Sequence, residues 1–215
     1  MIKNKSQPQS ISIKKSEESE KLAIFDFDGT LTTKDTLLAF IEFTKGKRRL
    51  YQELLLLSPE LILMKLGFGN NEKVKIKLLS RLFKGMQKET LEKLAEDFCA
   101  QNFTSLLRPK GLAKIQALKA ENYRIILVTA SVNIWVKPFA KKLDVELIAT
   151  EFLFKDQLFT GRLATPNCRG IEKINRLKKY LKQKKIPPYL MFGDSDGDQA
   201  LYNQASQYFH RHFHR

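Results

Sequence analysis

The sequence contains little cysteine. Its 215 residues include only two, Cys99 and Cys168, and their wide separation matches no metal-binding spacing. Two distant cysteines do not provide the disulfide framework that is typical of small secreted domains. A reduced, cytoplasmic location is therefore expected.

A long apolar run is also lacking. The best candidate for a membrane span, residues 50–69, is interrupted by Ser58, Pro59, Glu60 and Lys65, whereas a spanning helix needs about 20 mostly apolar residues. Residues 1–20 are polar and charged, without the apolar centre of a secretory signal. We expect no transmembrane segment, no signal peptide, and a disordered tail over residues 1–20.

Negative charge is scarce. The chain has 23 Asp and Glu residues against 38 Lys and Arg residues, which gives a net charge of +15. Such an excess predicts attraction to phosphorylated metabolites, phospholipid headgroups or nucleic acid, without selecting among them. The apolar fraction of 43% is ordinary, and the length suits one α/β domain with a small inserted lobe.

The pattern of apolar residues predicts an α/β fold. Residues 22–27 form a short apolar run that ends in carboxylates, which is typical of a buried strand. Residues 34–105 show helical spacing and are divided by glycines and a Ser-Pro pair into four or five helices. Strands and helices then alternate, which predicts a doubly wound, mainly parallel sheet with an all-helical insert. The expected domains are a tail (1–20), a core (21–33 and 107–215) and the insert (34–106).

The second half of the chain can be divided further. Its expected strands cover residues 123–129, 145–150 and 188–194, and its expected helices cover residues 111–120, 132–143, 170–185 and 197–206. Residues 152–163 alternate around Asp156 and Gln157, which indicates a hairpin, although Gln is a poor turn residue.

An acid pair follows the first predicted strand. Asp26 and Asp28 are separated by Phe27 and followed by Gly29. One carboxylate can attack phosphorus, and the other can protonate a leaving oxygen and then activate water. Gly29 allows a tight turn whose N–H groups can face a phosphate. The alternative is an ordinary β-turn with solvated acids.

A hydroxyl and a lysine follow later in the chain. Thr129 ends a predicted strand and can donate a hydrogen bond to a phosphoryl oxygen, but Thr at this position is commonly a helix cap. Ser131 is the more natural cap of the two. Lys173 begins a helix after a glycine-containing loop, where it can neutralise phosphoryl charge. The alternative is that Lys173 is one more solvated lysine.

A second acid cluster follows the last predicted strand. Asp194 and Asp198 flank the GDSDGD loop, and clustered carboxylates at a strand end suit Mg²⁺. The loop does not continue into a calcium-binding EF-hand pattern. Ligand sites of parallel sheets lie beyond the carboxyl ends of the strands, so we expect all of these groups to share one crevice. Their combination predicts phosphoryl-transfer chemistry.

These residues resemble the four motifs of the haloacid dehalogenase-like (HAD) hydrolase superfamily, and the resemblance covers residues 22 to about 205. It implies that Asp26 is the nucleophile and Asp28 the general acid and base. It also implies that Mg²⁺ binds to Asp26, the backbone carbonyl of Asp28, and Asp194, while Asp198 binds it through water or orients a ligand. In having an acid at position 28 the sequence resembles the phosphatases and phosphomutases of this superfamily, whereas its dehalogenases lack an acid there.

The helical insert resembles the cap of the phosphoserine phosphatase-like branch of this superfamily. Asp35 is placed like the acid that binds the substrate amine in those enzymes, but Arg81 is only loosely placed for their substrate-binding arginine. Gly197 also replaces an Asn that is usual in their fourth motif.

A second resemblance is to phosphatidylglycerophosphatases of HAD type. It rests on the spacing of Cys168, Gly170 and Lys173 and on the aromatic, basic end of the chain. The basic charge and the leucine-rich stretch 50–68 also suit an anionic lipid surface, although core packing explains the leucines as well. In both branches Arg169 is placed to help bind phosphate.

The expected function is that of a magnesium-dependent phosphatase with an aspartyl-phosphate intermediate. The expected partner is a small phosphorylated substrate or an anionic lipid headgroup, and the lipid case adds peripheral contact with the inner membrane surface. An alternative from another class is a basic module that binds nucleic acid through residues 176–185. A solvated helix face explains that run equally well, so no nucleic acid partner is expected. The other alternative is an inactive interaction protein, which the full set of catalytic residue types disfavours.

Overall fold

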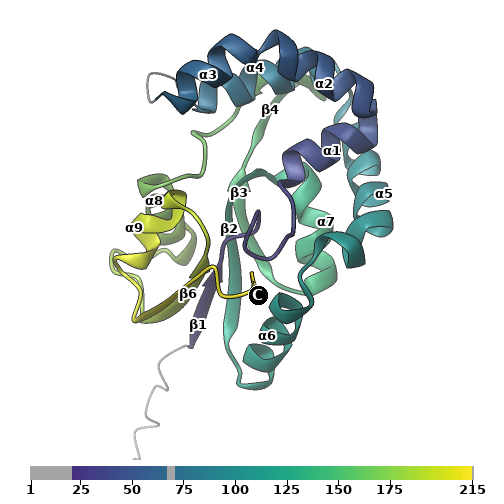
Figure 1. Cartoon of the computed structure of the whole chain (residues 1–215). Helices are drawn as coiled ribbons and strands as arrows, with labels where there is room; N and C mark the ends of the chain where they lie inside the picture. Colours follow the sequence, from purple (N-terminus) through teal and green to yellow (C-terminus); the bar gives the residue numbers. More distant parts are fainter. Residues whose placement is uncertain (1–20, 67–70, 215) are drawn as a thin grey trace, which may run out of the picture.

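The computed structural model describes residues 21–66 and 71–214, so the predicted tail 1–20 lies outside the described residues. The chain forms a five-stranded parallel sheet in the order β3-β2-β1-β6-β7 (Figure 1). Its strands are β1 (Leu22–Phe25), β2 (Arg124–Val132), β3 (Glu146–Thr150), β6 (Tyr189–Gly193) and β7 (Gln207–His210). The predicted mainly parallel sheet is confirmed.

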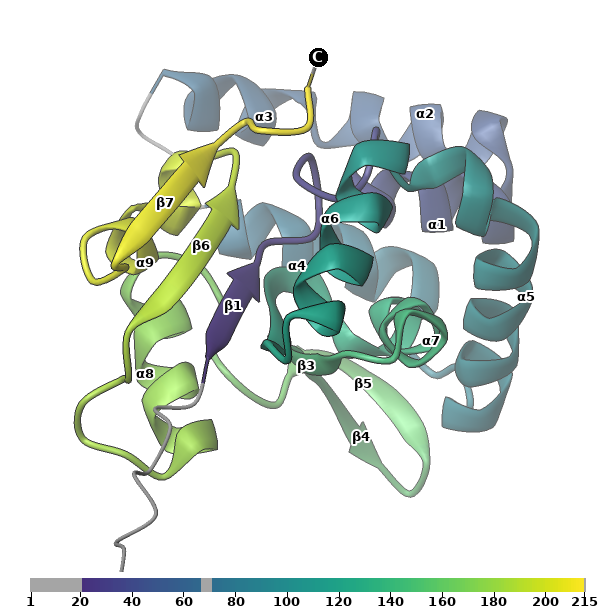
Figure 2. The same ribbon diagram turned by 90° about the horizontal axis from the view of Figure 1, so that it is seen from below.

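Helices cover both faces of this sheet (Figures 1 and 2). Side chains alternate along β1, so that Ala23 and Phe25 belong to one core cluster and Leu22 and Ile24 to the other. The first cluster includes side chains of α6 (Pro109–Ala120) and α7 (Asn133–Leu143), and the second those of α8 (Ile171–Leu181) and α9 (Gln199–Tyr202). The central strands are therefore apolar on both faces, as the sequence predicted.

Among the described residues, five helices lie between β1 and α6. They are α1 (Thr36–Lys45), α2 (Lys47–Leu56), α3 (Ser58–Lys65), α4 (Asn71–Phe83) and α5 (Lys88–Leu106). Gly46 and Gly85 take positive φ angles of 80° at the predicted breaks, while the predicted break at residues 67–69 lies outside the described residues. In Figure 1, α2, α3 and α4 lie across the top of the molecule.

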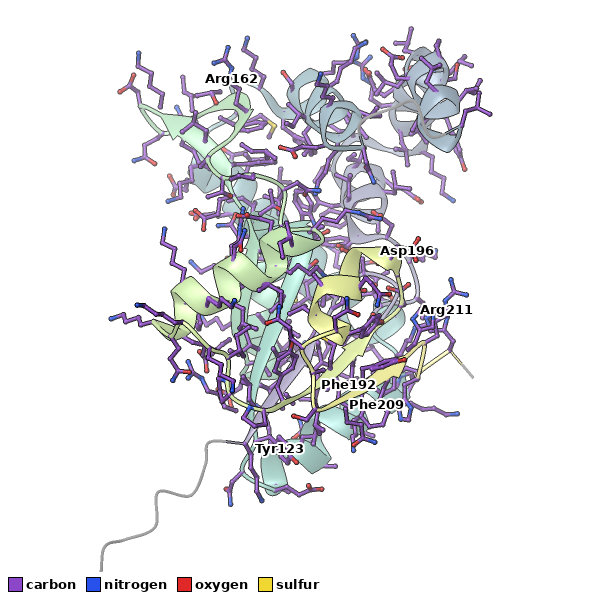
Figure 3. The ribbon with its side chains drawn as sticks, turned by 90° about the vertical axis from the view of Figure 1, so that its left-hand side faces the viewer. Tyr123, Arg162, Phe192, Asp196, Phe209 and Arg211 are labelled. Carbon is purple, nitrogen blue, oxygen red and sulfur yellow. The ribbon has the colours of Figure 1, made fainter. Side chains whose placement is uncertain are left out.

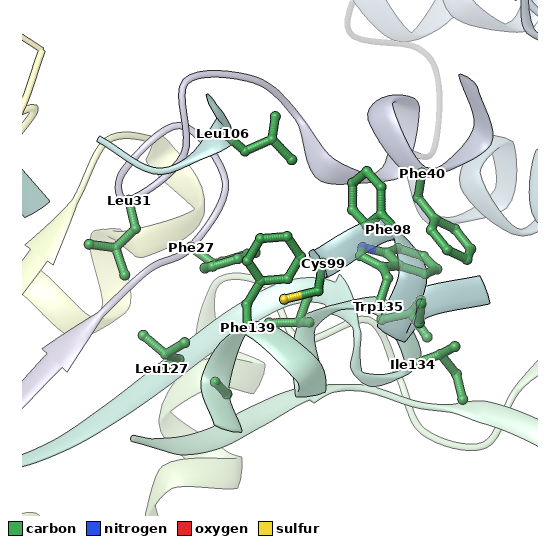
Figure 4. Close-up of a cluster of buried hydrophobic side chains, with 14 of the residues drawn as sticks. Phe27, Leu31, Phe40, Phe98, Cys99, Leu106, Leu127, Ile134, Trp135 and Phe139 are labelled. Atoms are coloured by element: carbon green, nitrogen blue, oxygen red, sulfur yellow. The ribbon is translucent and has the colours of Figure 1, made fainter. Parts of the chain in front are cut away.

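An aromatic cluster joins this insert to the sheet domain (Figure 4). Phe40 of α1 stacks on Trp135 of α7 with ring centroids 5.2 Å apart, and Phe98 of α5 meets Phe139 edge-on at 5.8 Å. Phe27 is fully buried in the same cluster and contacts Phe139 at 5.6 Å. Because Phe27 is anchored in the core, the backbone that carries its neighbours Asp26 and Asp28 is held in place.

The predicted hairpin is present as β4 (Phe152–Lys155) and β5 (Leu158–Leu163). Asp156 and Gln157 both have positive φ angles, 49° and 61°, which is the geometry of a type I′ turn. The hairpin packs against α4: a Cβ on Gly161 would lie 2.5 Å from Ser80 Oγ. The predicted insert 34–106 thus packs against a hairpin from the second half of the chain. The domain boundaries remain predictions.

The end of the chain differs from its prediction. The expected helix 197–206 is reduced to a short 3₁₀ turn (Asp196–Asp198) and the four-residue α9. The strand β7 then follows, which the sequence pattern did not reveal. Phe209 of β7 stacks on Phe192 at 4.6 Å (Figure 3), so tertiary packing holds this strand at the edge of the sheet. Among the described residues, no helix has the length and hydropathy that crossing a bilayer requires.

Candidate active site

The predicted site residues other than Asp198 line one cavity of about 540 Å³. Because β2, β1 and β6 are neighbours in a parallel sheet, the loops that follow them lie side by side. The cavity wall includes Asp26, Asp28, Thr129, Lys173 and Asp194. Gly29, Asp35 and Arg169 line it as well, and the insert contributes side chains of α2, α3 and α4.

A second, larger depression of about 910 Å³ lies elsewhere, against α7, α8 and β3. None of the predicted site residues lines it, and its charged walls include Lys137, Glu172 and Arg176. Size alone therefore does not mark the site. The smaller cavity is the one that gathers the acids.

Lys173 forms the electrostatic centre of the site. Its Nζ lies 2.6 Å from Asp26 Oδ1 and 2.6 Å from Asp198 Oδ1, and all three side chains are buried. Burial alone disfavours the ammonium form, but the charges of Asp26 and Asp198 outweigh it and raise the pKa of Lys173. Lys173 is therefore a fixed positive charge, and the alternative of a solvated surface lysine is wrong.

The carboxyl group of Asp26 has a pKa close to neutral. Burial raises its pKa to about 7, an effect that Lys173 opposes and that the nearby charges of Asp198 and Asp28 reinforce. A carboxylate in this position gains from any additional positive charge. A bound divalent cation would favour the ionised form that nucleophilic attack requires.

Asp198 holds the loop around the lysine. Its Oδ1 faces Lys173, and its Oδ2 accepts hydrogen bonds from Ser195 Oγ at 3.1 Å, Ser195 N at 3.2 Å and Asp194 N at 3.3 Å. Both oxygens thus have protein donors. Of the two roles that the resemblance implied for Asp198, this geometry suits the orienting one better than metal binding through water.

The donor set fits Mg²⁺. One carboxylate oxygen from each of Asp26, Asp194 and Asp198 lies within 4.8 Å of the others. Thr30 Oγ1 lies 3.3 Å from Asp26 Oδ2 and 3.3 Å from Asp194 Oδ1, which places it between the two acids. Burial and the charge of Asp198 also raise the pKa of Asp194. Clustered oxygen ligands that resist ionisation without added positive charge are suited to a hard divalent cation.

Gly29 makes room for Asp194. Its φ is +74°, and a Cβ at this position would lie 2.2 Å from Asp194 Oδ2. Its N–H donates to Thr32 Oγ1 at 3.1 Å, so this amide is engaged within its own loop. The close approach of Asp194 is the clear reason for glycine here, and the phosphate contact of Gly29 remains a prediction.

Asp28 is oriented by two donors. Its Oδ1 accepts from Thr36 N at 2.7 Å, and its Oδ2 accepts from the hydroxyl of Ser131. Thr36 Oγ1 in turn accepts from the indole N–H of Trp135 at 3.2 Å. The carboxylate of Asp28 is therefore half-buried and fixed, rather than solvated in a free turn.

Ser131 does not cap the following helix, contrary to the prediction. The N-cap of α7 is Val132, and the Ser131 side chain faces Asp28 instead. Thr129 Oγ1 accepts from Ser131 N at 3.0 Å, which leaves its own O–H free to donate. Thr129 lines the cavity, as the prediction requires, and its phosphate contact remains a prediction.

Lys75 is the main group that the sequence did not identify. It extends from α4, and its Nζ donates to Ala130 O and, at 3.1 Å, to Asn167 Oδ1. Burial lowers the pKa of Lys75, although the charges of Asp28 and Asp35 act against this effect. Helical spacing was the available signal, because Leu78, one turn further along α4, faces the same cavity.

Asp35 and Arg169 both line the cavity. Asp35 also caps α1 by accepting from Leu38 N at 3.1 Å, so it has a structural role in addition to any contact with substrate. A Cβ on Gly197 would lie 3.2 Å from Arg169 Cγ, so the glycine that replaces the usual Asn leaves room for Arg169. Arg81 pairs with the buried Glu53 instead, which removes the loose match to a substrate-binding arginine.

The end of the chain contacts both acidic loops. Arg211, labelled in Figure 3, donates to Asp194 O at 3.3 Å, and His214 Nε2 lies 2.8 Å from Gly29 O. Phe213, which lies between these two residues in the sequence, is buried, and its ring stacks on Phe192 with centroids 5.6 Å apart. These contacts fix the two backbone segments from which the acids project.

Comparison with known proteins agrees with this geometry. A family model for haloacid dehalogenase-like hydrolases matches residues 23–202. The chain belongs to this hydrolase family. The predicted superfamily is thus confirmed, and the matched HAD region includes every motif discussed above.

Relatives and solved structures support the same placement. This HAD hydrolase is 33% identical over 194 residues to the protein CicA of Caulobacter vibrioides, covering 89% of this chain and 86% of that protein. A Bordetella pertussis protein of unknown function has a similar structure, with a TM-score of 0.75, 20% identity, and coverage of 89% and 90% of the two chains. A phosphoserine phosphatase, solved as an analogue of its phospho-aspartyl intermediate, gives a TM-score of 0.60 at 21% identity, with 90% and 87% covered. At these identities the solved structures establish the fold.

Proposed function

We propose that the protein is a magnesium-dependent phosphatase that hydrolyses a phosphomonoester through a phosphorylated Asp26. The observation that carries this proposal is the position of the Asp26 carboxylate at the wall of a cavity, 2.6 Å from Lys173 Nζ and within 4.8 Å of carboxylate oxygens of Asp194 and Asp198. Family membership and the phosphoserine phosphatase neighbours support it.

The proposed reaction has two steps. An oxygen of Asp26 attacks phosphorus, the bond to the ester oxygen breaks, and Asp28 gives its proton to the leaving oxygen. Asp28 then takes a proton from water, whose oxygen attacks the same phosphorus and releases phosphate and Asp26. Lys173 and the hydroxyl of Thr129 stabilise the negative charge of the transferring group throughout.

Asp26, Asp194 and the backbone carbonyl of Asp28 would hold Mg²⁺, with Asp198 orienting the loop. The metal ion supplies positive charge next to the phosphoryl oxygens. Removing divalent cations with EDTA is expected to stop hydrolysis of p-nitrophenyl phosphate, and added MgCl₂ is expected to restore it. Asp194→Asn should raise the magnesium concentration that gives half-maximal activity. Full activity after exhaustive chelation would exclude a role for the metal.

Asp28→Asn is expected to lower kcat by about 10²–10⁴-fold, because the amide neither protonates the leaving oxygen nor activates water. The side chain keeps an acceptor for Thr36 N, so the fold should be retained. The matched control is Asp97→Asn, which changes an exposed acid on α5. A rate for Asp28→Asn equal to that of the control would refute the acid/base assignment.

Two classes of substrate are considered, a phosphorylated metabolite and a phospholipid headgroup. Besides the acids, the cavity wall contains Lys75 and apolar side chains of the insert, including Leu54, Leu61 and Leu78. A phosphorylated metabolite and the headgroup of a phospholipid both remain proposals. Comparing kcat/KM for phosphoserine and phosphatidylglycerophosphate in one assay would separate them.

Binding of nucleic acid has little support. In the basic run 176–185, Arg176 is directed to Glu172 at 2.9 Å and to the carbonyl of Ala149 at 2.6 Å. This guanidinium is thus engaged within the fold and does not form part of a phosphate-binding stripe.

A further inference from the structure

The outward face of α2 and α3 is apolar. Six large side chains described there are exposed, with exposed fractions from 49% at Leu63 to 74% at Leu55. They are Tyr51, Leu55, Leu56, Ile62, Leu63 and Leu66. We call these six residues the cap patch. Such a cluster on so short a segment is unusual, because soluble proteins rarely expose contiguous apolar surface unless it binds something.

Helical geometry shows that the exposure is not a consequence of core packing. Leu50 and Leu57 are buried, and Leu54 and Leu61 line the active-site cavity. The cap patch lies on the other side of the same helices, where Tyr51 and Leu55 are one turn apart. A surface helix that packs on one face normally has polar residues on the opposite face. Core packing therefore accounts for the inner leucines and leaves the cap patch unexplained.

The surroundings of the cap patch are positively charged. Residues 47–83 contain eight Lys and Arg residues and three Glu residues. Glu53 is buried against Arg49 and Arg81, and Glu60 pairs with Lys77. The acids of α2 and α3 are thus engaged by neighbouring cations, while the basic excess of the stretch remains. Two copies of the chain joined through this face would bring like charges together, whereas an anionic surface would be attracted.

We propose that the cap patch docks on an anionic phospholipid surface. The apolar side chains would enter the boundary between headgroups and acyl chains, and exposed basic residues such as Arg48 would lie near lipid phosphates. Docking would place the cavity wall formed by Leu54 and Leu61 about one helix diameter, or about 10–12 Å, from the lipid. This proposal goes beyond the phosphatase proposal and does not depend on it.

Vesicle co-sedimentation of the full chain tests this proposal. The wild type is expected to bind vesicles of phosphatidylcholine with phosphatidylglycerol, and to bind phosphatidylcholine alone much more weakly. Leu55→Ser with Ile62→Ser should weaken binding to the anionic vesicles by at least about tenfold, because both side chains leave the apolar contact. The matched control is Ile171→Ser with Tyr208→Ser, which removes exposed apolar groups outside the insert and should leave binding unchanged.

Measurements of activity and of oligomeric state distinguish lipid docking from misfolding and from dimerisation. The Leu55 and Ile62 variant should hydrolyse p-nitrophenyl phosphate at the wild-type rate, because neither residue lines the cavity. Equal vesicle binding by this variant and the wild type would overturn the proposal, as would no binding by the wild type. A wild-type dimer that the variant loses, together with absent vesicle binding, would assign the cap patch to a second copy instead.

Discussion

Asp26→Asn is expected to lower kcat by about 10⁴-fold or more while leaving the protein folded. The amide cannot attack phosphorus, and removal of a nucleophile that acts as part of a unit costs nearly the whole of its catalysis. Stability should change little, because the amide oxygen still accepts from Lys173 and the burial of an ionised Asp26 is relieved. Turnover of p-nitrophenyl phosphate and thermal unfolding followed by circular dichroism measure the two effects.

The matched control for this experiment lies in the second acidic loop. Asp196 is exposed there and takes no part in the proposed chemistry, so Asp196→Asn should keep wild-type turnover. Wild-type turnover in Asp26→Asn would remove the nucleophile assignment. Loss of turnover together with loss of the unfolding transition would indicate a structural role instead.

Lys173→Met is expected to destabilise the protein by about 3–5 kcal/mol and to abolish turnover. The substitution leaves Asp26 and Asp198 buried without the cation that both contact at 2.6 Å, and an uncompensated buried charge is strongly unfavourable. Urea unfolding at neutral pH measures the free energy of unfolding. Lys179→Met, which changes an exposed lysine on the same helix, should stay within about 0.5 kcal/mol of the wild type.

A second variant separates charge from packing. If buried charge causes the loss, adding Asp198→Asn to Lys173→Met removes one of the two like charges and should recover part of the stability. If the methionine simply packs badly, the second substitution should lower stability further. Wild-type stability in Lys173→Met would contradict the buried ion pairs altogether.

Much of the site could be predicted because its residues follow strands. A carboxylate directly after an apolar run, as at Asp26 and Asp194, leaves the core at the carboxyl end of a strand, and parallel strands bring such ends together. The residue types of the motifs indicate the chemistry. To predict that these residues meet in space, it was enough to predict a parallel sheet.

The groups that orient the site were harder to predict. Asp28 is held by Thr36 and Ser131, which are 95 residues apart in the chain. Lys75 reaches the cavity from the insert, and its helix contains several other lysines at similar intervals. These contacts depend on how the insert packs on the sheet, which local patterns do not specify.

The edge strand β7 was missed for a related reason. Its four residues are largely exposed, so they show no apolar run, and the strand is held by the ring stack of Phe209 on Phe192. The hairpin was found by its alternation, but its packing against α4 depends on Gly161 allowing close approach to Ser80. In both cases the stabilising contact is tertiary, whereas the sequence pattern reports local structure.

In the proposed mechanism Asp26 itself carries the phosphoryl group during turnover. Acid quenching of the wild-type enzyme during turnover, followed by peptide mass spectrometry, locates the modification directly. We expect a phosphorylated peptide with the group on Asp26, absent from Asp26→Asn and increased in Asp28→Asn relative to its rate of turnover. Sustained turnover by the wild type with no phosphorylated peptide, or with the group on another residue, would contradict it.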